Sequence, residues 1–121
     1  MHGEWVLAYA EDADGKEIEL QTHRLILDQN SDSYLSIRMN IVNDFIYQYR
    51  LDHELRLGEI TWATLTKGDG TSLESDSSMA HMKLEEDILQ RLLENVNRIR
   101  VQNEFKIQLI GEYYKATLVS T

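Results

Sequence analysis

The strongest constraint on the fold is a single helix pattern that stands between two groups of strand patterns. Apolar residues recur at Leu84, Ile88, Leu92 and Val96, which gives a helix over residues 82–97 one apolar face. Acidic side chains open this segment and arginines follow it, as the helix dipole favours. We therefore predict an α+β fold, in which a curled antiparallel sheet (a partial barrel of seven or eight strands) packs against one C-terminal-half α-helix.

Alternating apolar residues predict strands along the rest of the chain. The predicted strands cover residues 4–9, 17–21, 24–28, 35–41, 45–51, 55–57, 60–65, 98–102, 105–110 and 113–119. Glycine, asparagine, aspartate and serine predict turns or loops at residues 12–15, 28–33 and 52–54. Residues 67–78 have no clear period and are interpreted as a mobile loop.

Length and composition limit the class of protein. The chain has 121 residues and 42% hydrophobic residues, so we expect one domain over residues 1–121. Its net charge of −9 opposes binding to nucleic acid or to an anionic membrane, since both require a basic face. No apolar run is long enough to span a bilayer, and the chain enters a strand directly, so neither a transmembrane segment nor a signal peptide is expected in it.

No motif in the sequence predicts catalytic, cofactor-binding or metal-binding residues. Cysteine is absent, which excludes disulfides, thiolate zinc sites and cysteine nucleophiles. The four histidines lack metal-ligand spacing, and no G-x-S-x-G or phosphate-loop motif occurs. Glu85, Glu86 and Asp87 are interpreted as a solvated face of the helix, because three consecutive residues cannot all face inward.

The first predicted strand begins with Gly3-Glu4-Trp5, a pattern that also occurs in ligand-binding proteins. It is similar to the start of lipocalin-type barrels, where the tryptophan closes one end of a ligand cavity. A tryptophan early in a first strand also fits an ordinary core position. Both interpretations stay open at this point.

Four segments together resemble the META domain family, the HslJ-like proteins, in a divergent and cysteine-free form. Residues 3–7 are similar to the family's G-x-W-x-L opening strand, and residues 100–107 to its closing hairpin. Residues 43–49 resemble the central motif and retain Asn43, the aromatic Phe45 and the final Tyr49.

A further segment, residues 78–85, resembles the motif before the family's helix and retains Met-Ala. The two family cysteines are replaced by Val42 and His81, and the motif glycines near them by Ile41 and Tyr47. The resemblance implies a small bacterial protein with no agreed enzymatic activity, placed in the periplasm, secreted or lipid-anchored. Related cracked barrels hold lipid tails or partner segments in a groove, which is an analogy of fold alone.

Three functional hypotheses follow. The first is a non-enzymatic binding or structural module of the bacterial cell envelope, with an apolar groove between helix and sheet for a lipid tail or a protein segment. The candidate contacts of that groove are Trp5, Asn43, Phe45, Tyr49 and His81. The second is a lipocalin-like carrier with Trp5 at the closed end, which requires an up-and-down barrel with a cavity of about 300 Å³ or more. The third is a hydrolase that uses a pair of carboxylates.

Overall fold

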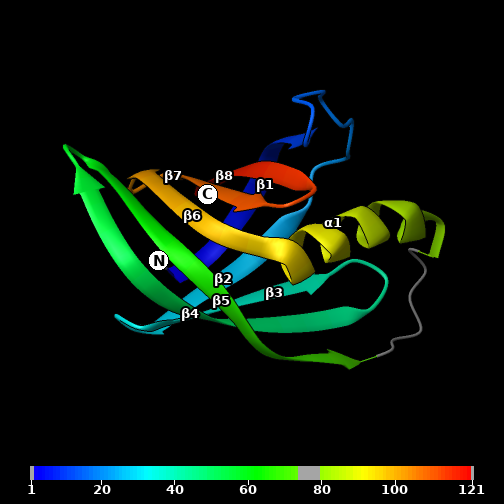
Figure 1. The fold of residues 1–121 in the computed structure, drawn as a ribbon. Coiled ribbons are helices and arrows are strands. Elements are labelled where there is room, and N and C mark those ends of the chain that lie inside the picture. The colour runs from blue at the N-terminus through cyan, green and yellow to red at the C-terminus, as the bar shows by residue number, and fades with distance from the viewer. Residues whose placement is uncertain (1, 74–79, 121) are drawn as a thin grey trace.

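The computed structural model describes residues 2–73 and 80–120. Within these residues, eight antiparallel strands follow one another around a closed barrel (Figure 1). The strands are β1 (His2–Asp12), β2 (Arg24–Ser31), β3 (Tyr34–Asn40), β4 (Asp44–Leu57), β5 (Ile60–Leu73), β6 (Val96–Asn103), β7 (Lys106–Gly111) and β8 (Tyr114–Ser120). A short 3-10 turn (Ala80–Met82) leads into the helix α1 (Lys83–Asn95), which lies between β5 and β6 in the chain.

The α+β class is confirmed, but the prediction of a partial barrel is wrong because the sheet closes. The first half of β1 pairs with β2, and Trp5 to Asp12 pair with β8. Pairing with β2 ends at Val6, while pairing with β8 continues to Asp12. A register shift between Leu7 and Tyr9, just after this point, bends β1. Both edges of β1 are thereby used, and closure removes the free edges that an open sheet would leave there.

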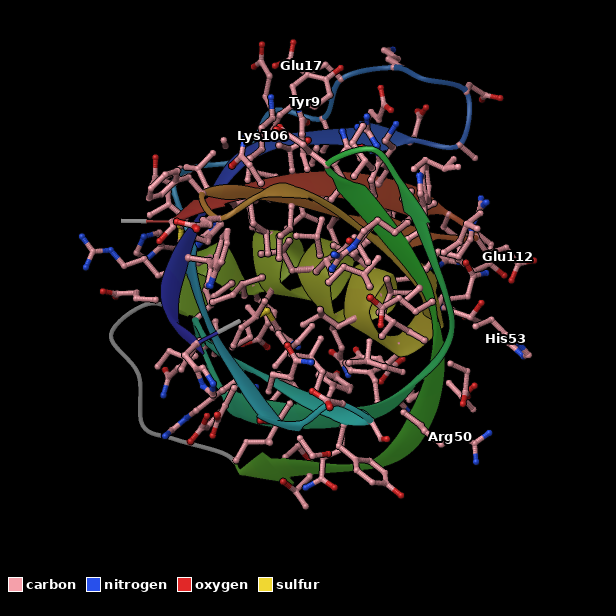
Figure 2. The ribbon with its side chains drawn as sticks, turned by 90° about the vertical axis from the view of Figure 1, so that its left-hand side faces the viewer. Tyr9, Glu17, Arg50, His53, Lys106 and Glu112 are labelled. Carbon is pink, nitrogen blue, oxygen red and sulfur yellow. The ribbon has the colours of Figure 1, made fainter. Side chains whose placement is uncertain are left out.

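The helix covers one end of the barrel. β5 pairs with β6 only over Thr61 to Thr64, and among the described residues the rest of β5 pairs with β4 alone. The two strands therefore diverge at this end, and α1 lies across the opening between them (Figure 1). Figure 2 looks into the barrel from the opposite end, with α1 behind it. Among residues 2–73 and 80–120, no helix has the length and apolar character required to cross a bilayer.

Several predicted boundaries differ from the observed ones. The helix ends at Asn95, because Val96 is already extended (φ −66°, ψ 130°) and begins β6. Residues 17–21 form no strand beyond an isolated bridge between Glu11 and Glu17, although Ile18 still donates its N–H to the Ala10 carbonyl at 2.9 Å. The apolar alternation there places Ile18 against the core without a full ladder.

The long hairpin of β4 and β5 accounts for the other differences. Residues 52–54 form no turn, because β4 continues through a register shift between Asp52 and Leu55, and the chain reverses at Gly58, with φ 65°. The loop expected over residues 67–78 is strand as far as Leu73, since β4 provides a partner for this polar segment. Residues 74–78 lie outside the described residues.

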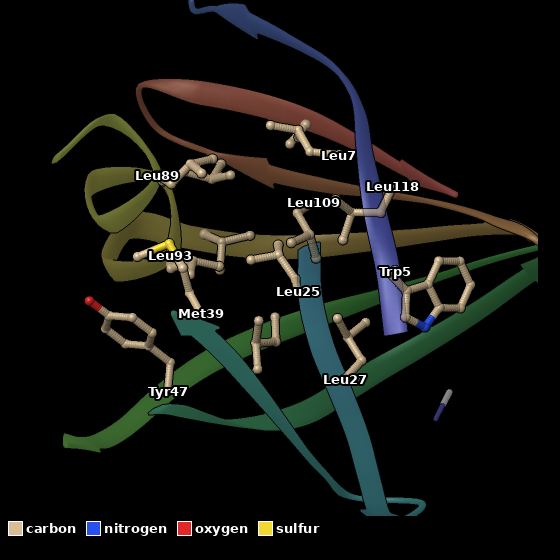
Figure 3. Close-up of a cluster of buried hydrophobic side chains, with 14 of the residues drawn as sticks. Trp5, Leu7, Leu25, Leu27, Met39, Tyr47, Leu89, Leu93, Leu109 and Leu118 are labelled. Atoms are coloured by element: carbon tan, nitrogen blue, oxygen red, sulfur yellow. The ribbon is translucent and has the colours of Figure 1, made fainter. Parts of the chain in front are cut away.

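The core is one continuous cluster that runs along the inside of the barrel from α1 to Trp5 (Figure 3). Alternate residues of the strands supply it, as their period requires. At the helix side it contains Met39, Tyr47 and Leu93, and at the other side Leu27 and Trp5. The barrel therefore has two ends of different character, one beneath α1 and one beyond Trp5.

Candidate functional site

The helix end of the barrel is filled by the apolar face of α1. Leu89, Leu92 and Leu93 are almost completely buried there. The buried Tyr49 hydroxyl donates a hydrogen bond to the Leu93 carbonyl. Burial raises the pKa of Tyr49, so its hydroxyl stays a neutral donor. These contacts pack this face of the helix against the strands below it.

Glu86 fastens α1 to the turn between β3 and β4. Its side chain is 0% exposed, and Oε2 accepts the backbone N–H groups of Val42 and Asn43, each at 2.7 Å. Oε1 accepts Asn43 Nδ2 and Lys83 Nζ, each at 3.1 Å. Burial opposes ionisation, but these donors outweigh it and hold the pKa of Glu86 below its usual value. The carboxylate is thus a structural anchor.

This anchor corrects the interpretation of residues 85–87 as a wholly solvated face. Glu86 lies three and seven residues before Leu89 and Leu93, so the helical period places all three on the buried face. That spacing was the available signal. Its neighbour Glu85 is also engaged, since Oε1 lies 2.9 Å from Nε2 of the buried His23 and accepts the Gln21 N–H at 2.7 Å.

A small cleft lies between α1 and the β4–β5 hairpin. Its volume is about 150 Å³, and it is lined by Phe45, Tyr47, Lys67, Gly70, Thr71, Ser72, Gln90 and Glu94. The Phe45 and Tyr47 rings stack with centroids 6.1 Å apart, and Lys67 Nζ lies 5.8 Å from the Tyr47 centroid. Small-molecule sites usually have volumes of about 300–1,000 Å³, so this cleft is too small for a lipid tail.

A further cavity lies at the end of the barrel opposite α1, which we call the mouth. Its volume is about 490 Å³, and it is lined by Gln29, Asp32, Leu51, Asp52, His53, Glu54, Thr61, Ala63, Ile99 and Val101. Leu51, Ala63, Ile99 and Val101 form its apolar wall. The wall continues the core, because Ile99 is a buried core residue while the other three pack against it and stay partly exposed.

The backbone of β4 is shaped where it borders the mouth. Between the Asp52–Thr64 and Leu55–Trp62 pairs, β4 has one residue more than β5, which makes a bulge. His53 in this bulge has φ 52°, the left-handed region that glycine prefers. Its side chain points away from the barrel (Figure 2), so the bulge contributes backbone rather than imidazole to the wall.

A second cavity of about 430 Å³ adjoins the mouth and shares Val101 with it. Its lining consists of His2, Trp5, Glu59, Val101, Asn103, Glu104 and Ser120. Trp5 is 3% exposed, and its Nε1 has no hydrogen-bond partner among the described residues. A buried donor without an acceptor is unusual, because folding has removed it from water without replacing that bond.

The five candidate contacts do not lie in one cavity. Trp5 lies in the second cavity beside the mouth, whereas Asn43 is bonded to Glu86, Phe45 lines the cleft and Tyr49 is packed under the helix. His81 is exposed at the start of the helical segment.

Trp5 also lies at the end of the core farthest from α1 (Figure 3), whereas the lipocalin-like hypothesis placed it at the closed end. The closed end is formed by the helix instead. The sequence patterns do not identify the residues of the mouth. Alternation predicts that Leu51, Ala63 and Val101 lie on strands, but it does not predict that no side chain fills the space between them.

Across the part of the chain that the structure describes, no group of three or more histidine, aspartate or glutamate residues is placed to hold a metal ion. Comparison with known proteins gives no matching family model, no matching curated protein and no matching solved structure. The resemblance to the META domain family therefore stays a prediction that rests on the sequence motifs.

Proposed function

We propose that this chain is a non-enzymatic binding module that holds a small, largely apolar ligand in the mouth of its barrel. The observation that carries the proposal is the cavity of about 490 Å³ with an apolar wall, at the open end of a barrel whose other end is filled. This volume lies within the usual range of about 300–1,000 Å³ for small-molecule sites.

The wall of the mouth is supported in a way that suits binding. Leu51, Ala63 and Val101 lie on three neighbouring paired strands, so the backbone holds them in place before a ligand arrives. The Leu51 N–H also donates to the Ser33 carbonyl at 2.7 Å, which fastens the β2–β3 turn beside the opening. A preformed site of this kind loses little entropy on binding.

The arrangement of polar groups favours binding over catalysis. Acid–base catalysis requires side chains held within hydrogen-bond reach of the reacting atoms and screened from water. Asp32 and Glu54 at the mouth are exposed instead. The proposal accordingly places the lipocalin-like hypothesis first, ahead of a groove beside the helix or a carboxylate hydrolase. The resemblance to the META domain family is the support for a location in the bacterial cell envelope.

The test uses Nile red, a neutral dye that becomes fluorescent in apolar sites. We expect the wild-type chain to bind it saturably, and Ala63→Phe to weaken binding by about tenfold because the phenyl ring occupies the cavity. Ala13→Phe is the matched control, since Ala13 is exposed in the turn after β1, and it should bind as the wild type does.

A second blocking variant, Val101→Phe, guards against loss of folding in the first, and circular dichroism verifies the fold of each. If neither blocking variant weakens dye binding in a folded chain, or if the wild type binds no dye, the proposal is wrong.

A further inference from the structure

We propose that the occupant of the mouth is a single-chain amphiphile with a cationic head group, its chain against the apolar wall and its head at the rim. This inference rests on the proposed function, because it names the ligand class of the same cavity. The division of the mouth into an apolar wall and an acidic rim supports it. An amphiphile is the class of molecule that satisfies both parts at once.

The linings of the mouth and of the adjoining cavity include five carboxylates. Asp32, Asp52 and Glu54 belong to the lining of the mouth, and Glu59 and Glu104 to that of the adjoining cavity. Among the described residues, neither lining includes a lysine or an arginine.

Arg50 forms an ion pair with one of these carboxylates, since its Nε lies 2.9 Å from Asp52 Oδ2. Its side chain points away from the barrel (Figure 2). One of the five carboxylates therefore has a partner outside the opening, and the rim keeps a negative potential.

This potential selects the sign of the head group. A carboxylate or phosphate at the rim is repelled by these like charges, whereas a cation is attracted to them, and both effects weaken beyond about 8 Å at physiological salt. The net charge of −9 over the whole chain adds to the same preference. An anionic fatty acid is thereby disfavoured even though its chain would suit the wall.

Trp5 supplies an independent observation. Trp5 belongs to the lining of the adjoining cavity, and its indole N–H is buried and lacks an acceptor among the described residues. An apolar chain alone would leave this donor unpaired. An ester or amide carbonyl between chain and head group provides an acceptor, so the inferred ligand carries one.

The test compares four ligands that share the decyl chain length: decanol, decanoate, decyltrimethylammonium and decanoylcholine, whose ester adds the acceptor. Each is titrated below its micellar concentration into the variant Trp62→Phe, in which Trp5 is the remaining tryptophan and reports on its own surroundings. We expect the two cations to bind about threefold to tenfold more tightly than decanol, and decanoate more weakly than decanol.

Decanoylcholine should bind most tightly and should change Trp5 emission most. Raising the salt concentration should lower the affinities of the two cations towards that of decanol, because salt screens their attraction to the rim carboxylates.

Two double variants distinguish the effect of the rim carboxylates on ligand preference from the effect of the net charge of the chain. Asp32→Asn with Glu54→Gln should reduce the preference for cations over decanol to about twofold or less. Asp14→Asn with Glu112→Gln removes the same charge from two exposed turns outside the mouth and should leave the preference unchanged.

The outcomes distinguish this inference from the proposed function. If all four ligands bind equally, or decanoate binds most tightly, the cationic ligand class is wrong while the apolar site stands. If decanoylcholine binds no more tightly than decyltrimethylammonium, the assignment of an acceptor to Trp5 is wrong. If no ligand binds, the proposed function itself fails.

Discussion

The two ends of this barrel are built from the same strands, but their apolar residues are buried to different extents. At the helix end, Leu89 and Leu93 enter the barrel and complete a core with almost no exposed surface. At the mouth, Leu51, Ala63 and Val101 surround a cavity of about 490 Å³ that no segment of the described chain enters. The one helix closes one end, and the apolar residues at the other end line a cavity.

Side-chain size reinforces the difference. An eight-stranded barrel has an interior that large side chains can fill or that can hold one small ligand. Beneath α1 the strands contribute Met39, Tyr47 and Tyr49, whereas the mouth is bordered by Thr61 and Ala63. The same architecture is therefore fully packed beneath α1 and has a cavity at the mouth.

The largest expected difference between the ends is in stability. Leu93→Ala should lower the free energy of unfolding by about 2–5 kcal/mol, because it leaves a cavity in a closed core. Leu51→Ala should cost only about 1 kcal/mol, since this side chain is already partly exposed at the mouth. Urea unfolding of both variants measures the two values. Equal losses would mean that the mouth is packed as tightly as the helix end.

The next effect concerns the carboxylate that holds the helix in place. Replacing Glu86 by Gln should cost about 2 kcal/mol at neutral pH, because charge-assisted hydrogen bonds to Val42 and Asn43 are lost. The folded-state pKa of Glu86 is lowered, so its contribution is complete above the ordinary pKa of about 4.3 and is lost as pH falls through the folded value.

The variant should therefore lose less stability than the wild type as pH falls below about 5. Asp87→Asn is the control, because Asp87 is exposed and its pairing with Lys83 at 2.8 Å contributes little. Denaturant unfolding at several pH values makes the measurement. If Glu86→Gln and the wild type have parallel pH profiles, the anchor does not act as a charged group.

The smallest effect belongs to the bulge at the mouth. His53→Gly should raise stability by about 0.5 kcal/mol, because glycine adopts φ 52° without the strain of a Cβ but loses more entropy on folding. His53→Ala keeps the Cβ and should give no gain. Thermal unfolding distinguishes the two variants. A gain with Ala, or a clear loss with Gly, would show that the imidazole itself stabilises the bulge.

The sequence allowed the helix and most of the strands to be predicted, because their apolar periods are local properties. Closure of the barrel was missed, since it depends on β1 pairing with β8 across the whole length of the chain. Glu86 was read as solvated because its partners, the N–H groups of Val42 and Asn43, are distant in sequence and are brought near by the β3–β4 turn. The mouth was missed because a cavity is an absence of side chains, which no local pattern encodes.

We propose that a ligand binds at the mouth and not at the helix end. A titration of the ¹⁵N-labelled chain with decanol, followed by amide chemical shifts, locates the binding site on the barrel. We expect saturable shifts at Leu51, Ala63, Ile99 and Val101, with Leu89 and Leu93 unmoved. Shifts confined to Phe45, Gln90 and Glu94, which line the cleft at the helix, or no shifts at all, would show that the proposal is wrong.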